Sequence, residues 1–489
     1  VTGEYTYMDY VTQQPGGLTY TAFLRNPAQS SRSRNWFAVN WNMASIKLDY
    51  KIDENNTINI RNFGFIGDRL ALMDSASFSN PRFLERQDEI DKNRTLIADY
   101  YRNIGSEGRY LKKYNLFKNK SSFLIGYRSY YGITEKIQGS GNNSKNPDFE
   151  FLTKYPDKPQ SFNYTFPNQN YALFSENVFN LTDKFSITPG LRLEYIKTGS
   201  SGLYYDPTTA HVLPEARTYP RSFLLLGIGS SLWLNSTSEL FFNFSQNYRG
   251  ITFTDLRPTN SINRIDQNLK DEYGFNSDMG IRGTVLDFLR YDCSIFYMLY
   301  NRRIGQTLEP AENGFDIYRL TSNIGASRHV GAEILGVLDI TKLIETPESI
   351  GSVTFTNSIG LVDASYFNTK KKTLEGNQVE YSPNLTYRSG IGYALKDFKA
   401  TIRYAYVSEQ FSDADNTYSL FASPVFGRIP AYDVWDFSLN YTYKWLILGA
   451  SINNITNNYY FTRRAESYPG PGIIPSEPRT FFFTLGLKI

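Results

Sequence analysis

The 489-residue sequence predicts an all-β fold, a transmembrane antiparallel β-barrel that occupies Val1–Ile489 as one domain. Three observations support this prediction: an alternating apolar strand at the C-terminus, connections that are short and long in turn, and an aromatic content of 16%. About eighteen strands are visible, a number that fits a porin-sized barrel or most of a barrel of about twenty-two strands.

The last segment, Arg479–Ile489, alternates with a period of two. One set of its side chains is wholly apolar: Phe481, Phe483, Leu485, Leu487 and Ile489. The other set is mostly polar or small: Phe482, Thr484, Gly486 and Lys488. Successive side chains point to opposite faces of a strand, so one face is greasy. A terminal strand frays unless its edges are paired, and pairing with the first strand of the same sheet would close a barrel.

The composition excludes several classes of protein. The 38 Tyr and 35 Phe suit aromatic girdles at the two membrane interfaces. A mean hydropathy of −0.42, with no run of about 18 apolar residues, excludes a helical membrane protein. The net charge of +3, without a basic tract, leaves no electrostatic footprint for nucleic acid. With Cys293 as the single cysteine and His211 and His329 as the two histidines, we expect no disulfide and no metal site or cofactor built from side chains.

The strands are predicted from alternation and from the turn residues that bound them. In chain order they are Val1–Tyr10, Arg34–Ile52, Thr57–Ala71, Arg109–Phe117, Ser122–Ile137, Asn163–Leu181, Phe185–Leu203, Phe223–Leu234, Glu239–Tyr248, Glu272–Gly283, Phe288–Gly305, Ile317–Asp339, Ser352–Phe367, Tyr381–Leu395, Phe398–Glu409, Val434–Tyr443, Leu446–Tyr460 and Arg479–Ile489. Within Arg34–Ile52 the apolar phase changes, which predicts a β-bulge near Ala44.

The connections between these strands are sorted by length. Tight turns such as Asp53–Asn56 and Thr182–Lys184 alternate with long polar loops, as in outer-membrane barrels with short periplasmic turns and long extracellular loops. The last strand follows a long extracellular loop, so it runs toward the periplasm. Counting back, the first visible strand runs toward the cell exterior. A soluble repeat of antiparallel sheets is disfavoured, because its open edges and uncovered apolar face would aggregate.

The C-terminal region resembles the end of TonB-dependent outer-membrane receptors of Gram-negative bacteria. The stretches that carry the resemblance, in chain order, are Tyr171–Leu181 with the TDKFSITPGLRLEY that follows, Leu269–Glu272, Ser327–Glu333, Asn454–Asn457 with Tyr459–Tyr460, and Pro478–Ile489. Three further stretches resemble ferric-citrate-type receptors: QQPGGLT (Gln13–Thr19), RGITFTDLRP (Arg249–Pro258) and FTRRAESYPGPGIIP (Phe461–Pro475).

Two departures from the family pattern accompany the resemblance. The family normally ends on Phe or Trp, whereas this sequence ends on Ile489. Family members also carry an N-terminal plug domain with an energy-coupling box, and nothing in Val1–Ile489 resembles either one. The resemblance implies that Val1–Tyr10 is the fifth of twenty-two strands, with the plug and four strands upstream.

The resemblance implies an importer that captures a ferric chelate, ferric citrate or another siderophore, at its outer loops. The transported chelate is the only ligand implied. An inner-membrane TonB-type protein would supply the work through the plug. A passive porin is one alternative. The other is a barrel within a larger surface assembly, with a surface lipoprotein as its partner. No catalytic arrangement stands out, and we predict no enzyme activity.

An anionic chelate needs cationic and amide donors at the mouth, since Arg matches carboxylates bidentately. The candidate ligand-binding residues are Gln246, Arg249, Arg257, Arg463 and Arg464. A polar lattice facing the lumen and the plug is expected from Arg192, Glu194, Arg328 and Glu333. Arg302 and Arg303 are placed near the outer rim, where they pair with lipopolysaccharide phosphates or with loop acids, and the outer face meets the lipid bilayer.

Overall fold

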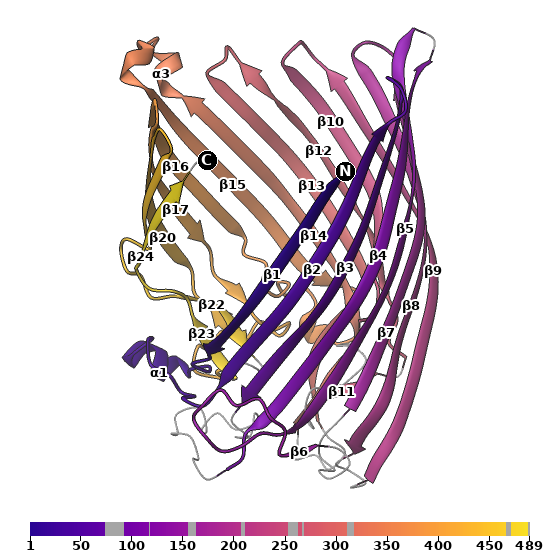
Figure 1. Cartoon of the computed structure of the whole chain (residues 1–489), viewed down its shortest axis with the longest axis vertical. Helices are drawn as coiled ribbons and strands as arrows, with labels where there is room; N and C mark the ends of the chain where they lie inside the picture. Colours follow the sequence, from indigo (N-terminus) through magenta and orange to yellow (C-terminus); the bar gives the residue numbers. More distant parts are fainter. Residues whose placement is uncertain are drawn as a thin grey trace.

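The computed structural model describes residues 1–73, 92–116, 118–154, 163–206, 211–252, 263–266, 268–310, 317–465 and 471–487. Nearly all the described strands belong to one 20-stranded sheet that curves into a wall of tilted strands (Figure 1). Neighbouring strands along the chain pair antiparallel, and the one parallel ladder among the described residues joins β11 to β14. The all-β antiparallel prediction is therefore confirmed.

The main strands follow one another around the sheet in chain order. They are β1 (Thr2–Gln13), β2 (Trp36–Lys51), β3 (Asn56–Met73), β4 (Thr95–Leu116), β5 (Asn119–Ser140), β7 (Asn163–Asn180), β8 (Phe185–Asp206), β9 (His211–Trp233), β10 (Ser238–Arg249), β12 (Glu272–Val285), β13 (Leu289–Pro310), β14 (Ile317–Asp339), β15 (Ser352–Phe367), β16 (Leu385–Leu395), β17 (Phe398–Val407), β20 (Tyr432–Tyr443), β21 (Leu446–Asn453) and β24 (Thr480–Leu487). Two short strands, β6 (Thr153–Lys154) and β11 (Asn263–Ile265), add to β5 and β14.

The connections separate by length onto the two ends of the wall, as predicted. Tight turns gather at the upper end in Figure 1, together with the one-turn helix α3 (Ile340–Leu343) and the 3-10 helix η2 (Glu348–Ile350). The long loops gather at the lower end. They contain helix α1 (Tyr20–Arg25), the 3-10 helix η3 (Lys372–Leu374) and two small hairpins, β18 (Gln410–Phe411) with β19 (Arg428–Ile429) and β22 (Phe461–Ala465) with β23 (Gly472–Pro475).

Strand β24 pairs with β21, and β1 pairs with β2. Among the described residues β24 and β1 do not pair with each other, so these two strands form the edges of the curved sheet. The apolar set on β24 is strongly exposed, with Phe483 at 84% and Leu485 at 73%. Such a surface suits contact with lipid rather than with water.

Three local predictions, one of a β-bulge and two of strand limits, were wrong. The predicted bulge near Ala44 is absent, because β2 pairs without a register shift with both β1 and β3. Its two apolar sets instead lie on opposite faces of one regular strand. The strand predicted at Arg109–Phe117 begins earlier than expected, since β4 starts at Thr95. Likewise His211, predicted in a loop, begins strand β9.

No helix in the described part of the chain combines the length and the apolar character needed to cross a bilayer.

Three long loops pack together at the lower end and form what we call the loop cap: residues 14–35, 408–431 and the described parts of 454–479. Its apolar core is Leu18, Ala22, Phe23, Ile429, Phe461 and Ile473. Leu18 and Ile473 exchange two backbone hydrogen bonds of 2.9 and 2.8 Å, which join the loop after β1 to the loop before β24. Burying each Leu, Ile or Phe side chain of this core stabilises the cap by about 1.5–3 kcal/mol.

Candidate functional site

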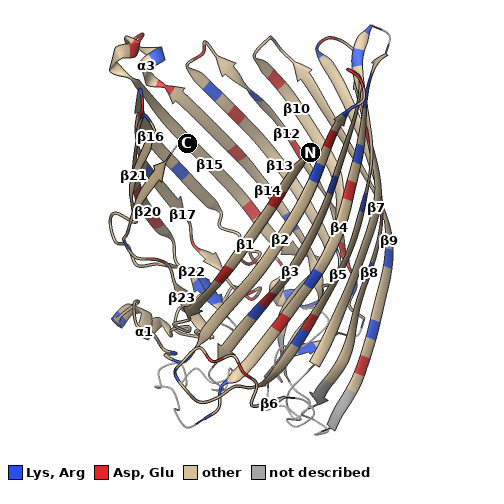
Figure 2. Cartoon of the chain, viewed as in Figure 1, with Lys and Arg blue, Asp and Glu red and all other residues tan. Residues whose placement is uncertain are grey.

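The two faces of the sheet differ in chemistry, and strand β8 shows the difference. Leu191 and Leu193 lie on one face and are 46% and 50% exposed. Arg192 and Glu194 lie on the other face, where Nε of Arg192 donates to Oε2 of Glu194 at 2.5 Å. Charged residues are distributed along the strands as well as in the loops (Figure 2). Because membrane barrels keep apolar side chains toward lipid, the polar face lines the interior.

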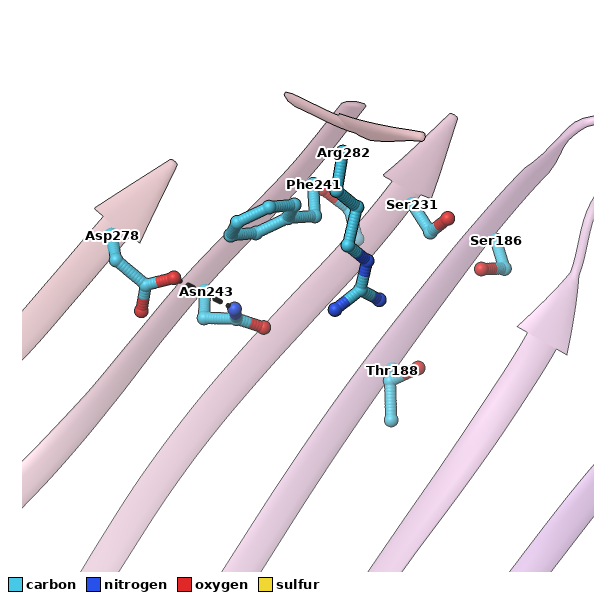
Figure 3. Close-up of a pocket in the computed structure, with 8 residues that line it drawn as sticks. Ser186, Thr188, Ser231, Phe241, Asn243, Asp278 and Arg282 are labelled. Carbon is cyan, nitrogen blue, oxygen red and sulfur yellow. Dashed lines mark hydrogen bonds between the residues drawn. The ribbon is translucent and has the colours of Figure 1, made fainter. Parts of the chain in front are cut away.

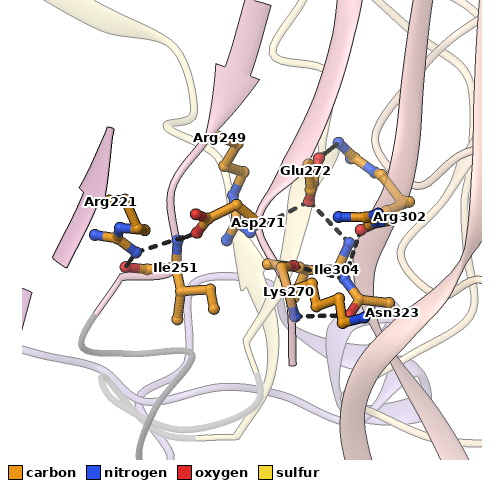
Figure 4. Close-up of polar contacts among 10 residues, drawn as sticks. Arg221, Arg249, Ile251, Lys270, Asp271, Glu272, Arg302, Ile304 and Asn323 are labelled. Atoms are coloured by element: carbon orange, nitrogen blue, oxygen red, sulfur yellow. Dashed lines mark hydrogen bonds and ion pairs between the residues drawn. The ribbon is translucent and has the colours of Figure 1, made fainter. Parts of the chain in front are cut away.

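A cluster of charges occupies the polar face where the strands meet the long loops; we call Arg221, Arg249, Asp271, Glu272 and Arg303 the mouth cluster. Figure 4 labels all of its members except Arg303. Its centre is Glu272, which is 1% exposed. The Glu272 carboxylate accepts from Nη1 of Arg249 at 3.2 Å, from Nη1 of Arg303 at 3.4 Å and from the backbone N–H of Ile304 at 2.8 Å. Three donors offset the cost of burying this charge.

Asp271 forms the second half of the mouth cluster. Its Oδ1 accepts from Nη1 of Arg221 at 3.1 Å and from the backbone N–H of Ile251 at 2.8 Å. Asn323 adds bonds to both backbone groups of Lys270, each 2.8 Å long. Together these contacts fix the two bases of the long connection between β10 and β12, so the cluster positions that loop.

Of the residues predicted to bind ligand, Arg249 lies on the polar face within the mouth cluster, and its side chain is 38% exposed. Gln246 lies on the opposite, apolar face, which also carries the exposed Leu240 and Phe242, and its Oε1 accepts from the backbone N–H of Leu226 at 3.0 Å. The prediction that Gln246 points inward was wrong, because residues three apart in an unbroken strand face opposite sides. Arg257 lies outside the described residues.

Arg463 and Arg464 lie on β22 in the loop cap, away from the mouth cluster in sequence. Arg463 is exposed, whereas Arg464 is 2% exposed. The Arg464 guanidinium donates to the carbonyl of Ser423 at 2.8 Å and twice to that of Arg428, at 3.2 and 2.9 Å. Its donors therefore tie two loops together. Because loop carbonyls occupy these donors in this structure, the ligand-binding role of Arg464 stays a prediction.

Burial decides the electrostatics of the loop cap. It lowers the pKa of Arg464 to about 10, and the neighbouring Asp413 carboxylate opposes this shift. The guanidinium thus stays charged at neutral pH. Burial also raises the pKa of Asp413, against two hydrogen bonds from Thr417, of 3.2 Å from its N–H and 2.9 Å from its hydroxyl. The Arg464 guanidinium and the Asp413 carboxyl group both serve loop structure.

The four residues expected in the lumen lattice divide between the two faces. Arg192, Glu194 and Glu333 lie on the polar face, Glu333 opposite Ser294. Arg328 is exposed on the apolar face, which it shares with Val330 and Ile334, so its predicted inward direction was wrong. Arg328 and Glu333 are five residues apart in a strand with unbroken pairing, and an odd separation places them on opposite faces.

The polar face also carries a shallow cavity of about 340 Å³ between β8, β9, β10 and β12 (Figure 3). It is lined by Ser186, Thr188, Ser230, Ser231, Phe241, Asn243, Asp278 and Arg282. Asn243 donates to Asp278 at 3.0 Å, and Arg282 pairs with Glu239. The hydroxyls and paired charges make this part of the wall polar. No group of three or more metal-ligating side chains occurs among the described residues.

A family model for the β-barrel of TonB-dependent receptor-like proteins matches residues 1–455. The chain belongs to this family. Family members are transporters and receptors of the Gram-negative outer membrane.

Solved structures share the fold with this TonB-dependent receptor barrel. The ferric citrate transporter FecA, unliganded, superposes with a TM-score of 0.76 at 21% identity, covering 100% of this chain and 67% of its own. The siderophore receptor PiuA from Acinetobacter baumannii gives 0.70 at 14% identity, covering 99% and 71%. The ferric yersiniabactin receptor FyuA from Yersinia pestis gives 0.69 at 13%, covering 93% and 62%. The chain thus spans roughly two thirds of their length.

Sequence reasoning missed the centre of the mouth cluster. Asp271 and Glu272 belong to the stretch Leu269–Glu272, which supported the family resemblance, but neither was predicted to have a role. Arg303 was predicted near the outer rim, with lipopolysaccharide phosphates or loop acids as its partners. The structure pairs Arg303 with Glu272, a residue at the start of a strand. A signal was present in the two adjacent acids at the end of a long loop, but their partners come from other strands.

Proposed function

We propose that this TonB-dependent receptor barrel imports a ferric chelate, with ferric citrate or another siderophore as the ligand. A TonB-type protein would power the import through a plug domain in the lumen. The family assignment and the similarity to solved ferric-chelate receptors support the class of function. The mouth cluster supports an anionic ligand.

The observation that carries the proposal is the placement of three arginines at the loop end of the polar face. Arg221, Arg249 and Arg303 share two acids, Asp271 and Glu272, so the mouth cluster keeps a formal charge of +1. Arg249 is the most exposed of the three side chains, at 38%, against 27% for Arg303 and 12% for Arg221. A chelate carboxylate can reach Arg249 while Glu272 keeps the base of the loop in place.

Arg249→Gln is expected to weaken ferric citrate binding about tenfold or more, because it removes a charge-assisted contact worth about 1.4 kcal/mol or more. Equilibrium binding of radiolabelled ferric citrate to the detergent-purified protein measures the change. Arg61→Gln is the matched control, since Arg61 forms an exposed ion pair with Glu4 near the short turns. Equal affinity in wild type and Arg249→Gln would remove Arg249 from the site. If the wild-type protein bound another ferric chelate but no ferric citrate, that chelate would become the proposed ligand.

A further inference from the structure

The apolar face of β13 and β14 ends abruptly near the long loops. Along β13 it consists of Tyr291, Cys293, Ile295, Tyr297 and Leu299, and Ile295 is 57% exposed. Along β14 it includes Val330 and Ile334, 43% and 44% exposed. An aromatic row, Phe244–Phe275–Tyr297, crosses this face with ring centroids 5.3 and 5.7 Å apart. Such a row marks the boundary between hydrocarbon and headgroups.

Arg302 lies just beyond that boundary, in a β-bulge of β13 between Tyr300 and Arg303. Its φ of +54° is unusual for a side chain of this size, and such outliers persist where neighbours hold them. Two contacts hold this one: Asn323 Nδ2 donates to the Arg302 carbonyl at 2.7 Å, and the guanidinium lies 5.0 Å from the Tyr273 ring centroid. Because Tyr273 is 49% exposed on the apolar face, the bulge directs Arg302 outward.

Arg328 stands beside it on the neighbouring strand. It is exposed on the same face, opposite Leu299, and its Nε donates to Ser365 Oγ at 3.3 Å. The bulge places Arg302 about two residues from Arg328 in register, a diagonal separation of about 7–8 Å between backbones. Two long side chains can converge on one group over that distance.

Two lysines and two acids lie around this pair of arginines. Lys370 and Lys372 are exposed in the loop after β15, and the backbone N–H of Lys370 donates to the Ile324 carbonyl of β14 at 3.0 Å. The nearby acids are Asp363, exposed opposite Val330, and Glu375, whose carboxylate accepts the backbone N–H groups of Asn368 and Thr369 at 2.9 and 3.0 Å. Glu375 is thus committed to its own loop.

We infer that Arg302 and Arg328 form a binding site on the outer wall for a phosphate of the lipopolysaccharide headgroup. Planar guanidinium groups match phosphate oxygens bidentately, and both are placed at headgroup depth on the face that meets lipid. The aromatic row seats the acyl chains below the site, and Lys370 and Lys372 extend the positive field above it. The site is distinct from the mouth cluster, which lies on the opposite face of the sheet and shares only strand β13 with it.

The test compares wild type with Arg302→Gln/Arg328→Gln, delipidated in mild detergent and titrated with bisphosphorylated lipid A. Native mass spectrometry counts bound molecules. We expect binding to weaken about tenfold or more in the double variant, while Arg61→Gln, which alters an inward-facing arginine, binds as wild type does. A folded barrel in each variant is checked by its heat-dependent gel mobility.

Two parallel titrations identify the source of the phosphate. Inorganic phosphate and phosphatidylglycerol are each expected to bind wild type at least tenfold more weakly than lipid A. Equal binding of either ligand would overturn the assignment to the glycolipid, and unchanged lipid A binding in the double variant would overturn the site. Ferric citrate binding should stay unchanged in the double variant, so this test and that of the proposed function fail independently.

Discussion

Replacing Glu272 with alanine should lower the free energy of unfolding around the mouth cluster by about 3–5 kcal/mol. The carboxylate is 1% exposed and holds Arg249, Arg303 and the N–H of Ile304. Its loss removes the Glu272 carboxylate from two guanidinium groups, those of Arg249 and Arg303, at the base of the loop between β10 and β12. Hydrogen exchange measures the effect: amides at residues 250–252 and 268–273 should lose protection.

Two variants define the cause. Glu272→Gln keeps an amide oxygen for the N–H of Ile304 but loses the charge, so its effect should fall between wild type and alanine. Glu107→Ala removes an acid that also pairs with two arginines, Arg109 and Arg128, but these are 51% and 43% exposed. Its effect should stay below about 1 kcal/mol. Similar losses for Glu107→Ala and Glu272→Ala would contradict the role assigned to burial.

Arg464→Ala should open the loop cap while leaving the strands intact. The guanidinium donates to carbonyls of Ser423 and Arg428, and each hydrogen bond from a charged group contributes about 1.5–3 kcal/mol. We therefore expect a local loss of at least about 3 kcal/mol. Limited proteolysis should show faster cleavage within 411–431 and 454–465, with the heat-dependent gel mobility of the barrel unchanged.

The neighbouring residue supplies the control. Arg463→Ala changes an exposed arginine on the same strand, and its proteolysis pattern should match wild type. If Arg464→Ala left the cap protected yet abolished ferric citrate binding, Arg464 would be a ligand residue after all. A cap that opens together with a modest loss of affinity would fit a positioning role only.

Alternation and loop parity predicted much of the fold because both are local. Each of the eighteen predicted strands has a counterpart in the sheet, since a period of two needs no knowledge of partners. The errors arose where the strand face of a residue was assigned without counting its odd or even separation from neighbours in the same strand. The change of apolar phase in β2 reflects a strand with apolar residues on both faces, not a bulge at Ala44. Arg328 is five residues from the inward-facing Glu333, and Gln246 is three residues from the inward-facing Arg249. Both separations are odd, so both Arg328 and Gln246 would have been assigned to the outer face.

The candidate site was harder to predict, because its contacts join residues far apart in the chain. Arg464 was selected for its charge, but only its bonds to loop 411–431 show that the charge is buried. Arg303 was placed near the rim, and Glu272, 31 residues away, proved to be its partner. Residue type indicates which chemistry is available, whereas tertiary packing decides which groups remain accessible to a ligand.

By itself, the sequence determined the class of this protein: a β-barrel wall with one greasy face, short turns at one end and long loops at the other. Those features follow from side-chain alternation and turn chemistry, which act over a few residues. Only the tertiary structure decided which arginines face the interior, which face lipid and which are buried under other loops. Such assignments depend on strand register and loop packing, and these bring together groups whose separation in sequence carries no signal.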